Sequence, residues 1–360
     1  MKVLFYISTI RGGGAARVMV NIANGLASNG HEVIFVTNFP ANHEYELDSR
    51  IDRHILEAEE SRSNALVKNL TRIKALKKII RKNDPDVSIA FMRENNFRLM
   101  FASKGLRTKT IVSVRNDPAK EYPSKFSKML AEYLYKKADG IVFQTEDAKK
   151  AFSSCVQEKS CIIFNQVDEK FFDDNPARGD YIAACGRLSK QKNYPMMLRG
   201  FAASVKTHPD EHLKIYGEGN LKEEMEGLAR ELGIQENVEF MGFSTDMKSV
   251  YKNAKLLVMT SDYEGMPNAV LEALASSVPV ISTDCPCGGP KMIIEEGKNG
   301  YLVRTRDSED FTAKLNAFLD LSDEQNRDMR NNAFQTGQKF SPPVILKDWT
   351  DMLGRILKCC

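Results

Sequence analysis

The sequence lacks the features that mark membrane-spanning, secreted and disulfide-stabilised proteins. No apolar run approaches the roughly 20 residues that a helix needs to cross a bilayer. The N-terminal stretch MKVLFYISTI is followed by RGGG, without the small-residue cleavage site of a signal peptide. The seven cysteines are an odd number without a regular framework, which favours reduced thiols over disulfides. We therefore expect a cytoplasmic protein.

Signatures of several enzyme classes are also missing. There is no GxSxG elbow of a serine hydrolase. The dinucleotide fingerprint GxGxxG is incomplete, because Arg17 stands where its third glycine belongs, which counts against a dehydrogenase. Cys285 and Cys287 have no second Cys or His pair at zinc-ligand spacing. The Asp84-Pro-Asp86 triplet precedes its strand and is interpreted as a turn. No metal site and no cofactor are predicted.

The balance of charge differs between the two halves of the chain. Residues 1–167 hold 27 Lys and Arg against 18 Asp and Glu, whereas residues 168–360 hold 24 against 30. A single core rarely grows beyond roughly 250–300 residues, so 360 residues suggest two domains. The opposite charges indicate that the two domains face different partners. No nucleic-acid-binding module accompanies the cations, and no nucleic-acid partner is expected.

Short β-rich runs alternate with helical patterns along the whole chain. In the first half, strands are predicted at residues 2–8, 32–38, 86–92, 110–116, 140–145 and 161–167, and helices at 15–29, 64–82 and 124–137. In the second half, strands are predicted at 181–186, 213–217, 238–242, 256–261, 278–283 and 301–303, and helices at 193–205, 220–232, 246–253, from Pro267 onward, near 289–296 and within about 307–357. Such alternation predicts parallel sheets covered by helices on both faces.

We therefore predict an α/β fold of two doubly wound, Rossmann-like domains that face a cleft. The domains would span residues 1–167 and 180–342, joined by the polar linker 168–180. In such sheets, ligands bind beyond the carboxyl ends of the strands.

One candidate ligand loop is GRLSKQKN (186–193), which follows a predicted strand directly. Arg187 and Lys192 are two cations at that strand end, and together they could neutralise a diphosphate. The alternative is a solvated basic loop.

Two glutamates, Glu264 and Glu272, lie in SDYEGMPNAVLEALASSVPV (261–280). Pro267 suits the start of a helix, so the N–H groups of residues 265–269 would form an anion site. Glu272 has only apolar neighbours in AVLEALA, where a carboxylate needs hydrogen-bonding partners. The hydroxyls of a ribose would supply them. Alternatively, Glu272 points outward between two apolar stripes or pairs with a lysine.

Other loops follow predicted strands in the same way. The glycine-rich segments RGGGAAR (11–17) and YGEGN (216–220) allow a close approach of backbone to a ligand, although a plain tight turn would also explain the second. Arg115 and Asn116 end the strand in IVSVRNDP and suit a ligand-binding edge.

The segment ALVKNLTRIKALKKIIRK (65–82) has seven cations and no acid. Its apolar residues form a helical stripe. Either this helix packs on the sheet with a basic outer face, or its surface docks on an anionic membrane.

Taken in order, the motifs GGGAARV, GRLSKQKN, YGEGN, FMGF, EGMPNAVLE and DCPCGGPKMI resemble the retaining glycosyltransferases of family 4, which have the GT-B fold. The resemblance covers essentially the whole chain. It implies a metal-independent transfer of a hexose or N-acetylhexosamine, most simply from a UDP-linked sugar. It also implies that a C-terminal helix at about 343–357 packs back on the first, acceptor-binding domain, while the second domain binds the nucleotide sugar.

The resemblance assigns roles to matching positions. Arg187 and Lys192 would hold the diphosphate, Glu272 the ribose and Glu264 the transferred sugar. The residues that it implies for catalysis are Glu264, Arg187, Lys192, Arg115 and Asn116. Those that it implies for donor binding are Gly13, Gly14, Gly186, Arg187, Lys192, Gly217, Met241, Phe243, Glu264, Gly265, Met266, Pro267, Asn268 and Glu272.

Three positions depart from the pattern of the family. Ala16 replaces a frequent glutamate, Arg115-Asn116 replaces a frequent histidine, and Lys291 replaces a common acid. The form DCPxGGP looks like enzymes of bacterial capsule and O-antigen assembly, whose acceptors are often polyprenyl-diphosphate sugars. We therefore expect a glycan or lipid-linked acceptor and a peripheral location at the inner face of the cell membrane. The alternatives are a soluble disaccharide synthase or epimerase of the same fold, and a non-catalytic binding or scaffold subunit.

Overall fold

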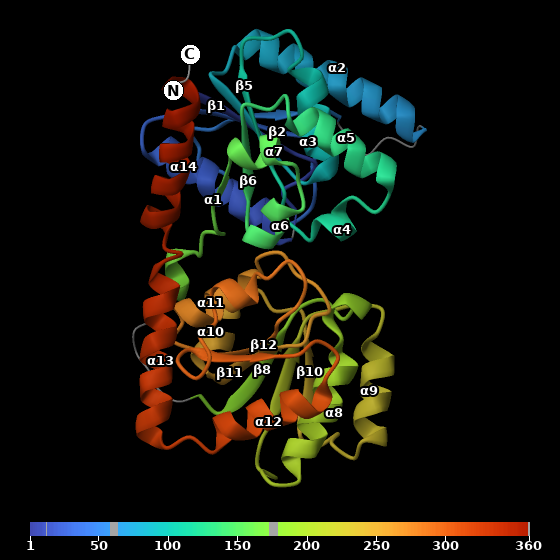
Figure 1. Ribbon diagram of the computed structural model, residues 1–360, viewed down its shortest axis with the longest axis vertical. Coiled ribbons are helices and arrows are strands. Elements are labelled where there is room, and N and C mark those ends of the chain that lie inside the picture. The colour runs from blue at the N-terminus through green and yellow to red at the C-terminus, as the bar shows by residue number, and fades with distance from the viewer. Residues whose placement is uncertain (12, 58–63, 173–178, 359–360) are drawn as a thin grey trace. The chain divides into compact units, whose positions relative to one another are not determined.

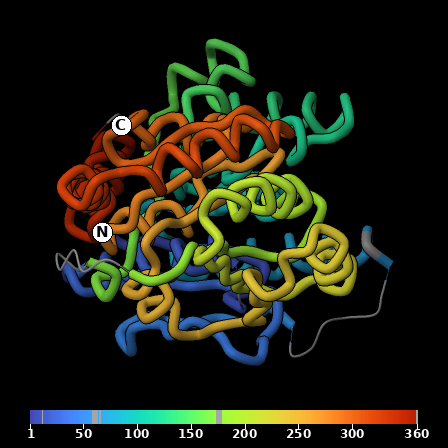
Figure 2. Tube along the Cα trace, turned by 90° about the horizontal axis from the view of Figure 1, so that it is seen from below, coloured from blue at the N-terminus to red at the C-terminus, as the bar shows by residue number. Residues whose placement is uncertain are grey.

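The computed structural model describes residues 1–11, 13–57, 64–172 and 179–358 (Figure 1). The chain folds into two compact units. Unit 1 comprises Met1–Gln166 and Pro342–Cys360, and unit 2 comprises Val167–Ser341. The chain therefore passes into unit 2 once and returns once, as the colours of Figure 1 show; Figure 2 shows the same trace from below.

Unit 1 is built on a seven-stranded parallel sheet in the order β3-β2-β1-β4-β5-β6-β7. Its strands are β1 (Lys2–Ile7), β2 (Glu32–Thr37), β3 (Asp52–Ile55), β4 (Val87–Phe91), β5 (Lys109–Ser113), β6 (Gly140–Phe143) and β7 (Ser160–Ile162). Its helices are α1 (Gly14–Ser28), α2 (Ala65–Asn83), α3 (Arg93–Ala102), α4 (Pro118–Glu121), α5 (Lys125–Tyr135), α6 (Glu146–Lys150), α7 (Ser154–Glu158) and α14 (Pro342–Lys358).

Two apolar layers cover the faces of this sheet. On one face, alternate strand residues pack against α1 and α14, and Trp349 of α14 is fully buried with its ring stacked 5.8 Å from that of Phe91. On the other face, the intervening strand residues pack against Leu76 and Ile80 of α2 and against α3. The alternation of strand side chains thus produces the doubly wound arrangement.

Unit 2 is built on a six-stranded parallel sheet in the order β10-β9-β8-β11-β12-β13. Its strands are β8 (Tyr181–Cys185), β9 (Leu213–Tyr216), β10 (Val238–Gly242), β11 (Ala254–Met259), β12 (Val280–Thr283) and β13 (Gly300–Val303). Its helices are α8 (Tyr194–Val205), α9 (Lys222–Glu231), α10 (Met247–Lys252), α11 (Asn268–Ala275), α12 (Ser308–Leu319) and α13 (Asp323–Gln338), with 3-10 turns η1 (Glu169–Phe171), η2 (Lys190–Lys192) and η3 (Pro290–Met292). Helices α8, α9 and α12 share the main core with one face of the sheet.

Three sequence expectations need correction. The strand expected to run to Val167 ends at Ile162, and the Val167 amide donates to the Phe340 carbonyl instead. The polar segment after it is not all linker, because Phe171 is buried in unit 2; residues 173–178 lie outside the described residues. The helix expected near 289–296 is only the turn η3, which ends at Ile293, where φ is −127°; before it, Gly289 packs against backbone, and a Cβ there would lie 1.8 Å from the Gly265 carbonyl oxygen.

No helix in the described part of the chain combines the length and apolar character needed to span a bilayer.

Candidate functional site

In unit 2, loops at the carboxyl ends of β8 and β11 bring Lys192 and Glu264 together. The Lys192 Nζ lies 2.7 Å from the Glu264 Oε1, and the Ser261 hydroxyl donates to the same oxygen at 2.8 Å. The Glu264 side chain is only 11% exposed and that of Lys192 is 19% exposed. The sequence predicted both residues for one site, and the structure places them in direct contact; it also adds Ser261, three residues before Glu264, which sequence reasoning missed.

These two loops are tied together by further hydrogen bonds. The Gln191 carbonyl accepts from the Asp262 amide at 2.8 Å, and the Asn193 side chain donates to the Asp262 carboxylate at 2.9 Å. Thr260 donates to the carbonyls of both Lys192 and Asn193. Because these bonds join Lys192 and its two neighbours to residues just before Glu264, they position Lys192 relative to Glu264.

Glu272 lies in α11 and is only 4% exposed. Its Oε2 accepts a hydrogen bond from the Tyr251 hydroxyl at 3.1 Å. The side chain therefore does not point outward, which removes one alternative left open by the sequence. Tyr251 comes from α10, 21 residues away, and only the fold brings it to Glu272.

Two buried thiols lie at the same edge of the sheet. Burial raises the pKa of Cys185 at the end of β8 to about 12 and that of Cys285 after β12 to about 12. Both thiols therefore remain protonated near neutral pH, and neither supplies a thiolate nucleophile.

The predicted glycines allow close packing of backbone at this edge. Gly217 has φ +141°, and a Cβ there would lie 2.0 Å from the Gly186 carbonyl oxygen. Only glycine fits such a contact. Beside them, the Tyr194 hydroxyl donates to the Gly186 carbonyl at 2.9 Å.

The remaining donor-binding candidates of unit 2 differ in their exposure. Arg187 is exposed and makes no ion pair within the residues that the structure describes. Gly265, Met266 and Pro267 are buried, and Pro267 occupies the cap position of α11 with Asn268 as its first residue. At the end of β10, by contrast, two side chains project into solvent: Met241 is 45% exposed and Phe243 is 71% exposed.

Unit 1 carries the other candidates. The Arg115 guanidinium lies 4.2 Å from the centre of the Phe91 ring, and its Nη2 donates to the Asn165 Oδ1 at 2.5 Å. Burial lowers the pKa of Arg115 to about 9. Asn116 accepts from the Asp117 amide and shapes the start of α4. Phe91 in turn rests on Trp349, so the terminal helix supports this group.

Sequence reasoning missed Glu121 in α4. Its Oε1 accepts from the Arg93 amide at 2.7 Å, whereas its Oε2 is buried and has no hydrogen-bond partner among the residues that the structure describes. Burial raises the pKa of this carboxyl to about 7. An available signal was Asp117-Pro118, a helix-start pair that places Glu121 in the first turn.

Gly13 caps α1 with φ +99°, a value that favours glycine, and Gly14 is the first residue of the helix. Gly12 lies outside the described residues. Ala16 is buried in the apolar core of unit 1, where a glutamate would be an unpaired charge. Lys291 is exposed, with its Nζ 3.3 Å from the Asp284 carboxylate. Among the residues that the structure describes, no three His, Cys, Asp or Glu side chains converge as a metal site requires.

Comparison with known families gives two matches. The family model described as "Glycosyl transferases group 1" matches residues 166–336, and the family model described as "Glycosyltransferase Family 4" matches residues 12–171. Together they span nearly the whole chain.

Curated relatives match over full length. A GalNAc-α-(1→4)-GalNAc-α-(1→3)-diNAcBac-PP-undecaprenol α-1,4-N-acetyl-D-galactosaminyltransferase of Campylobacter jejuni is 29% identical, covering 99% of each chain. The amylovoran biosynthesis glycosyltransferase AmsD of Erwinia amylovora is 27% identical, covering 98% of this chain and 99% of its own.

Solved structures share the fold. Anabaena HepE in complex with UDP superposes with a TM-score of 0.81 at 17% identity, covering 99% of this chain and 100% of its own. The sucrose-phosphate synthase of Thermosynechococcus elongatus gives 0.84 at 16% identity and covers 100% of both chains.

The two doubly wound units and the matches define a sugar-transferring enzyme of GT-B fold. The chain belongs to the family 4 glycosyltransferases. The family, the fold class and the enzyme class predicted from the sequence are thereby confirmed.

Proposed function

We propose that this glycosyltransferase moves a hexose or N-acetylhexosamine from a UDP-linked sugar to a glycan or polyprenyl-diphosphate-linked acceptor of a bacterial surface polysaccharide, without a metal ion and with retention of configuration. The observation that carries the proposal is the contact of Lys192 with Glu264 at the carboxyl ends of the strands of unit 2, together with the burial of Glu272 in the helix that follows. This is where doubly wound sheets bind ligands.

The donor would be held by charge and hydrogen bonds. Arg187 is exposed and without an ion pair among the described residues, so its guanidinium is available for the diphosphate. Lys192 adds a second positive charge, and the two cations would stabilise the leaving phosphate as a metal ion does elsewhere. Glu272 would accept hydrogen bonds from the ribose hydroxyls, and Glu264 from the hydroxyls of the transferred sugar.

We propose retention on the basis of family 4 membership; the described residues near Glu264 bear only on how a retained product forms, since they disfavour a covalent intermediate. The two neighbouring thiols are protonated, and Glu264 is engaged by Lys192 and Ser261. In the proposed step, the bond from the sugar carbon to the phosphate oxygen breaks while the acceptor oxygen bonds to that carbon on the same face. The acceptor proton passes to the leaving phosphate oxygen, so no side chain has to form a covalent intermediate.

The acceptor class is supported by the relatives. The Campylobacter jejuni enzyme is named for an undecaprenyl-diphosphate-linked acceptor, and AmsD for amylovoran biosynthesis. We propose an acceptor of the same class here, bound by unit 1, where Arg115 and Asn116 would contact it or the transferred sugar.

A surface of unit 1 supports a location at an anionic membrane. The first half of α2 exposes Leu66, Val67 and Leu70 to solvent, each more than half exposed, in place of the fully packed stripe that the periodicity suggests. Helix α5 likewise exposes Phe126, Met129 and Tyr133 along one face.

Lysines lie on or next to the same two helices. Lys77 of α2 donates to the Lys104 carbonyl, and Lys137 donates to the Tyr133 hydroxyl at 2.5 Å. Apolar side chains accompanied by lysines are typical of surfaces that lie in the headgroup region of an anionic bilayer. We therefore propose that the protein works as a peripheral enzyme at the inner face of the cell membrane.

Thermal unfolding with a panel of UDP, GDP, ADP and NAD, each with and without EDTA, tests the donor. A nucleotide at 100 times its Kd stabilises the folded state by about 2.7 kcal/mol, which raises the unfolding temperature measurably. We expect a shift with UDP that survives EDTA. A shift with GDP or ADP alone would change the donor, loss of the shift in EDTA would contradict metal independence, and no shift at all would favour a scaffold protein.

A further inference from the structure

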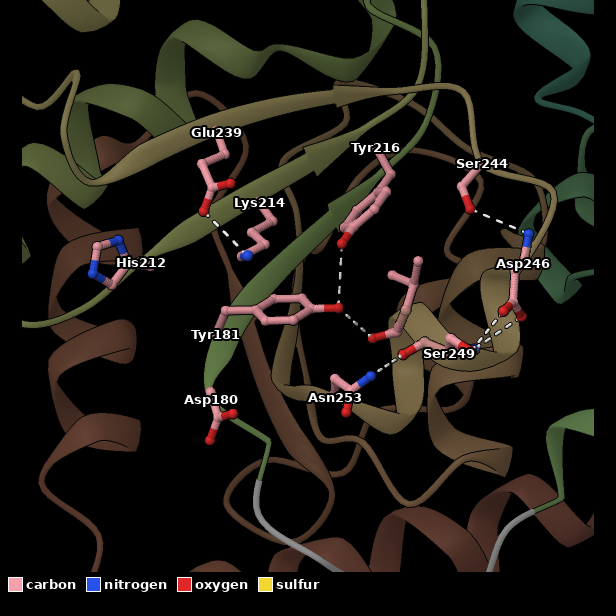
Figure 3. A pocket seen from close by; sticks show the side chains of 11 residues that line it. Asp180, Tyr181, His212, Lys214, Tyr216, Glu239, Ser244, Asp246, Ser249 and Asn253 are labelled. Atoms are coloured by element: carbon pink, nitrogen blue, oxygen red, sulfur yellow. Dashed lines mark hydrogen bonds and ion pairs between the residues drawn. The ribbon is translucent and has the colours of Figure 1, made fainter.

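A pocket on the sheet of unit 2 is lined by none of the candidate donor residues, although Gly217 and Phe243 directly follow and precede its lining residues Tyr216 and Ser244. Alternate residues of β9 and β10 point to the side of the sheet opposite the main core, and there Lys214, Tyr216 and Glu239 form its floor. Helix α10 and the loop before it form a wall (Figure 3). Its volume of about 620 Å³ is that of a small-molecule site.

The polar groups of the pocket are held in place by one another. The Tyr216 hydroxyl donates to the Tyr181 hydroxyl at 3.3 Å, which donates to the Val250 carbonyl at 2.9 Å. Figure 3 shows the two hydroxyls pointing toward each other between their strands. Lys214 pairs with Glu239 at 3.2 Å, and its Nζ lies 5.0 Å from the centre of the Tyr181 ring. A site ordered in this way loses little entropy when a ligand binds.

The charge of the pocket selects its ligand. Three carboxylates, Asp180, Glu239 and Asp246, face one lysine and one histidine. Their repulsion disfavours phosphates, so the pocket does not suit a nucleotide diphosphate. Two of the carboxylates already have partners, because Glu239 pairs with Lys214 and Asp246 accepts from the Ser249 hydroxyl at 2.6 Å. Their remaining lone pairs suit hydroxyl donors better than a second full cation.

We propose that this pocket binds an uncharged oligosaccharide, with the partly exposed Tyr216 ring against the apolar face of a sugar and carboxylates accepting from the sugar hydroxyls. The proposal extends the proposed function, on which it rests for its expectation of a glycan, by giving the donor-binding unit a glycan site of its own. None of the candidate donor residues lines the pocket, so donor and oligosaccharide bind at the same time.

The experiment is saturation-transfer NMR on the full chain, with N-acetylchitotriose and maltotriose as probes and saturating UDP present. We expect transfer to at least one probe. Tyr216→Ala should weaken its binding about tenfold through lost stacking and hydrogen bonding. Glu239→Gln should weaken binding of the probe about threefold. This variant still tests the proposal if Tyr216→Ala does not fold. Glu236→Gln, an exposed neighbour outside the pocket, is the control and should leave binding unchanged.

Several outcomes would overturn the inference. These are no transfer to either probe, binding that UDP displaces, binding that resists both pocket variants, or a preference for the cationic deacetylated chitotriose. UDP binding is followed in the same samples by its own signals. If UDP binds and the sugars do not, only the pocket proposal fails. If the sugars bind in the pocket and UDP does not, the donor proposal fails and the pocket stands as a glycan site.

Discussion

Replacing Lys192 with methionine removes the cation that pairs with Glu264. Methionine keeps the length of the side chain and leaves little cavity. The carboxylate that remains is only 11% exposed and retains the Ser261 hydroxyl as a donor at 2.8 Å. The variant therefore isolates the cost of a buried charge that has lost its partner.

The expected loss of stability follows from the burial of the pair. Breaking a buried ion pair by removing one partner costs about 3–5 kcal/mol. Since 19% of the Lys192 side chain is accessible, some water can replace it, and we expect a loss near the lower end, about 3 kcal/mol. In the double variant Lys192→Met with Glu264→Gln, both charges are gone, and stability should return to within about 1 kcal/mol of the parent.

Urea unfolding measures this loss. The single tryptophan, Trp349, lies in α14 of unit 1, so its fluorescence reports on unit 1, whereas far-UV circular dichroism reports on both units. The lysine variant should lower the midpoint of the dichroism transition at unchanged slope. Lys190→Met is the matched control, because Lys190 is exposed in the same turn, and it should change stability by less than about 0.5 kcal/mol. A loss below about 1 kcal/mol, or a double variant no more stable than the single one, would refute the reasoning.

Three further predictions follow. The raised pKa of Glu121 means that the folded state binds more protons than the unfolded state between pH about 4.5 and 7, so stability falls by about 3 kcal/mol as pH rises through that window. Glu121→Gln should flatten the profile of stability against pH measured by tryptophan fluorescence. A variant profile parallel to that of the parent would show that Glu121 does not cause this pH dependence. Gly217→Ala should destabilise the folded state by on the order of 3 kcal/mol in thermal unfolding, because the new Cβ meets the Gly186 backbone. Gly233→Ala, where the Cβ would enter open space, should cost only about 1 kcal/mol. Equal losses in the two variants would contradict the packing argument. Glutamate in place of Lys74, Lys77, Lys78 and Arg81 should reduce binding to anionic vesicles in a flotation assay. Undiminished flotation would exclude α2 from the membrane surface.

The parts of the fold that sequence reasoning predicted are those with a strong local pattern. Apolar runs such as that of β1 are buried throughout and were recognisable as strands of a parallel sheet. Strand β3 was missed because its residues, DRHI, are partly exposed and lack the apolar signal. Helix α3 was missed because it buries Asn95 and Asn96, whose side chains donate to the carbonyls of Phe91 and Ser113. A polar residue satisfied by distant backbone leaves no periodic trace in the sequence.

The same division holds at the candidate site. The spacing of Glu264 and Glu272 after a strand placed both residues at one sheet edge. Their partners required the fold, because Lys192 lies 72 residues from Glu264 and Tyr251 lies 21 residues from Glu272. Lys192 was found through its motif, whereas Tyr251 belongs to no motif. The close contact of Gly289 with the Gly265 backbone was also missed, because a contact between two backbones has no signature in composition.

The most direct test of the donor site compares UDP with 2′-deoxy-UDP by titration calorimetry. If Glu272 accepts from the ribose, the parent protein should bind UDP roughly tenfold or more tightly than the deoxy compound, since a hydrogen bond to a charged group contributes about 1.5–3 kcal/mol. Glu272→Ala should bind both equally and weakly, while Glu231→Ala, an exposed control on α9, should discriminate as the parent does. Equal binding by the parent, or discrimination that persists in Glu272→Ala, would contradict the account.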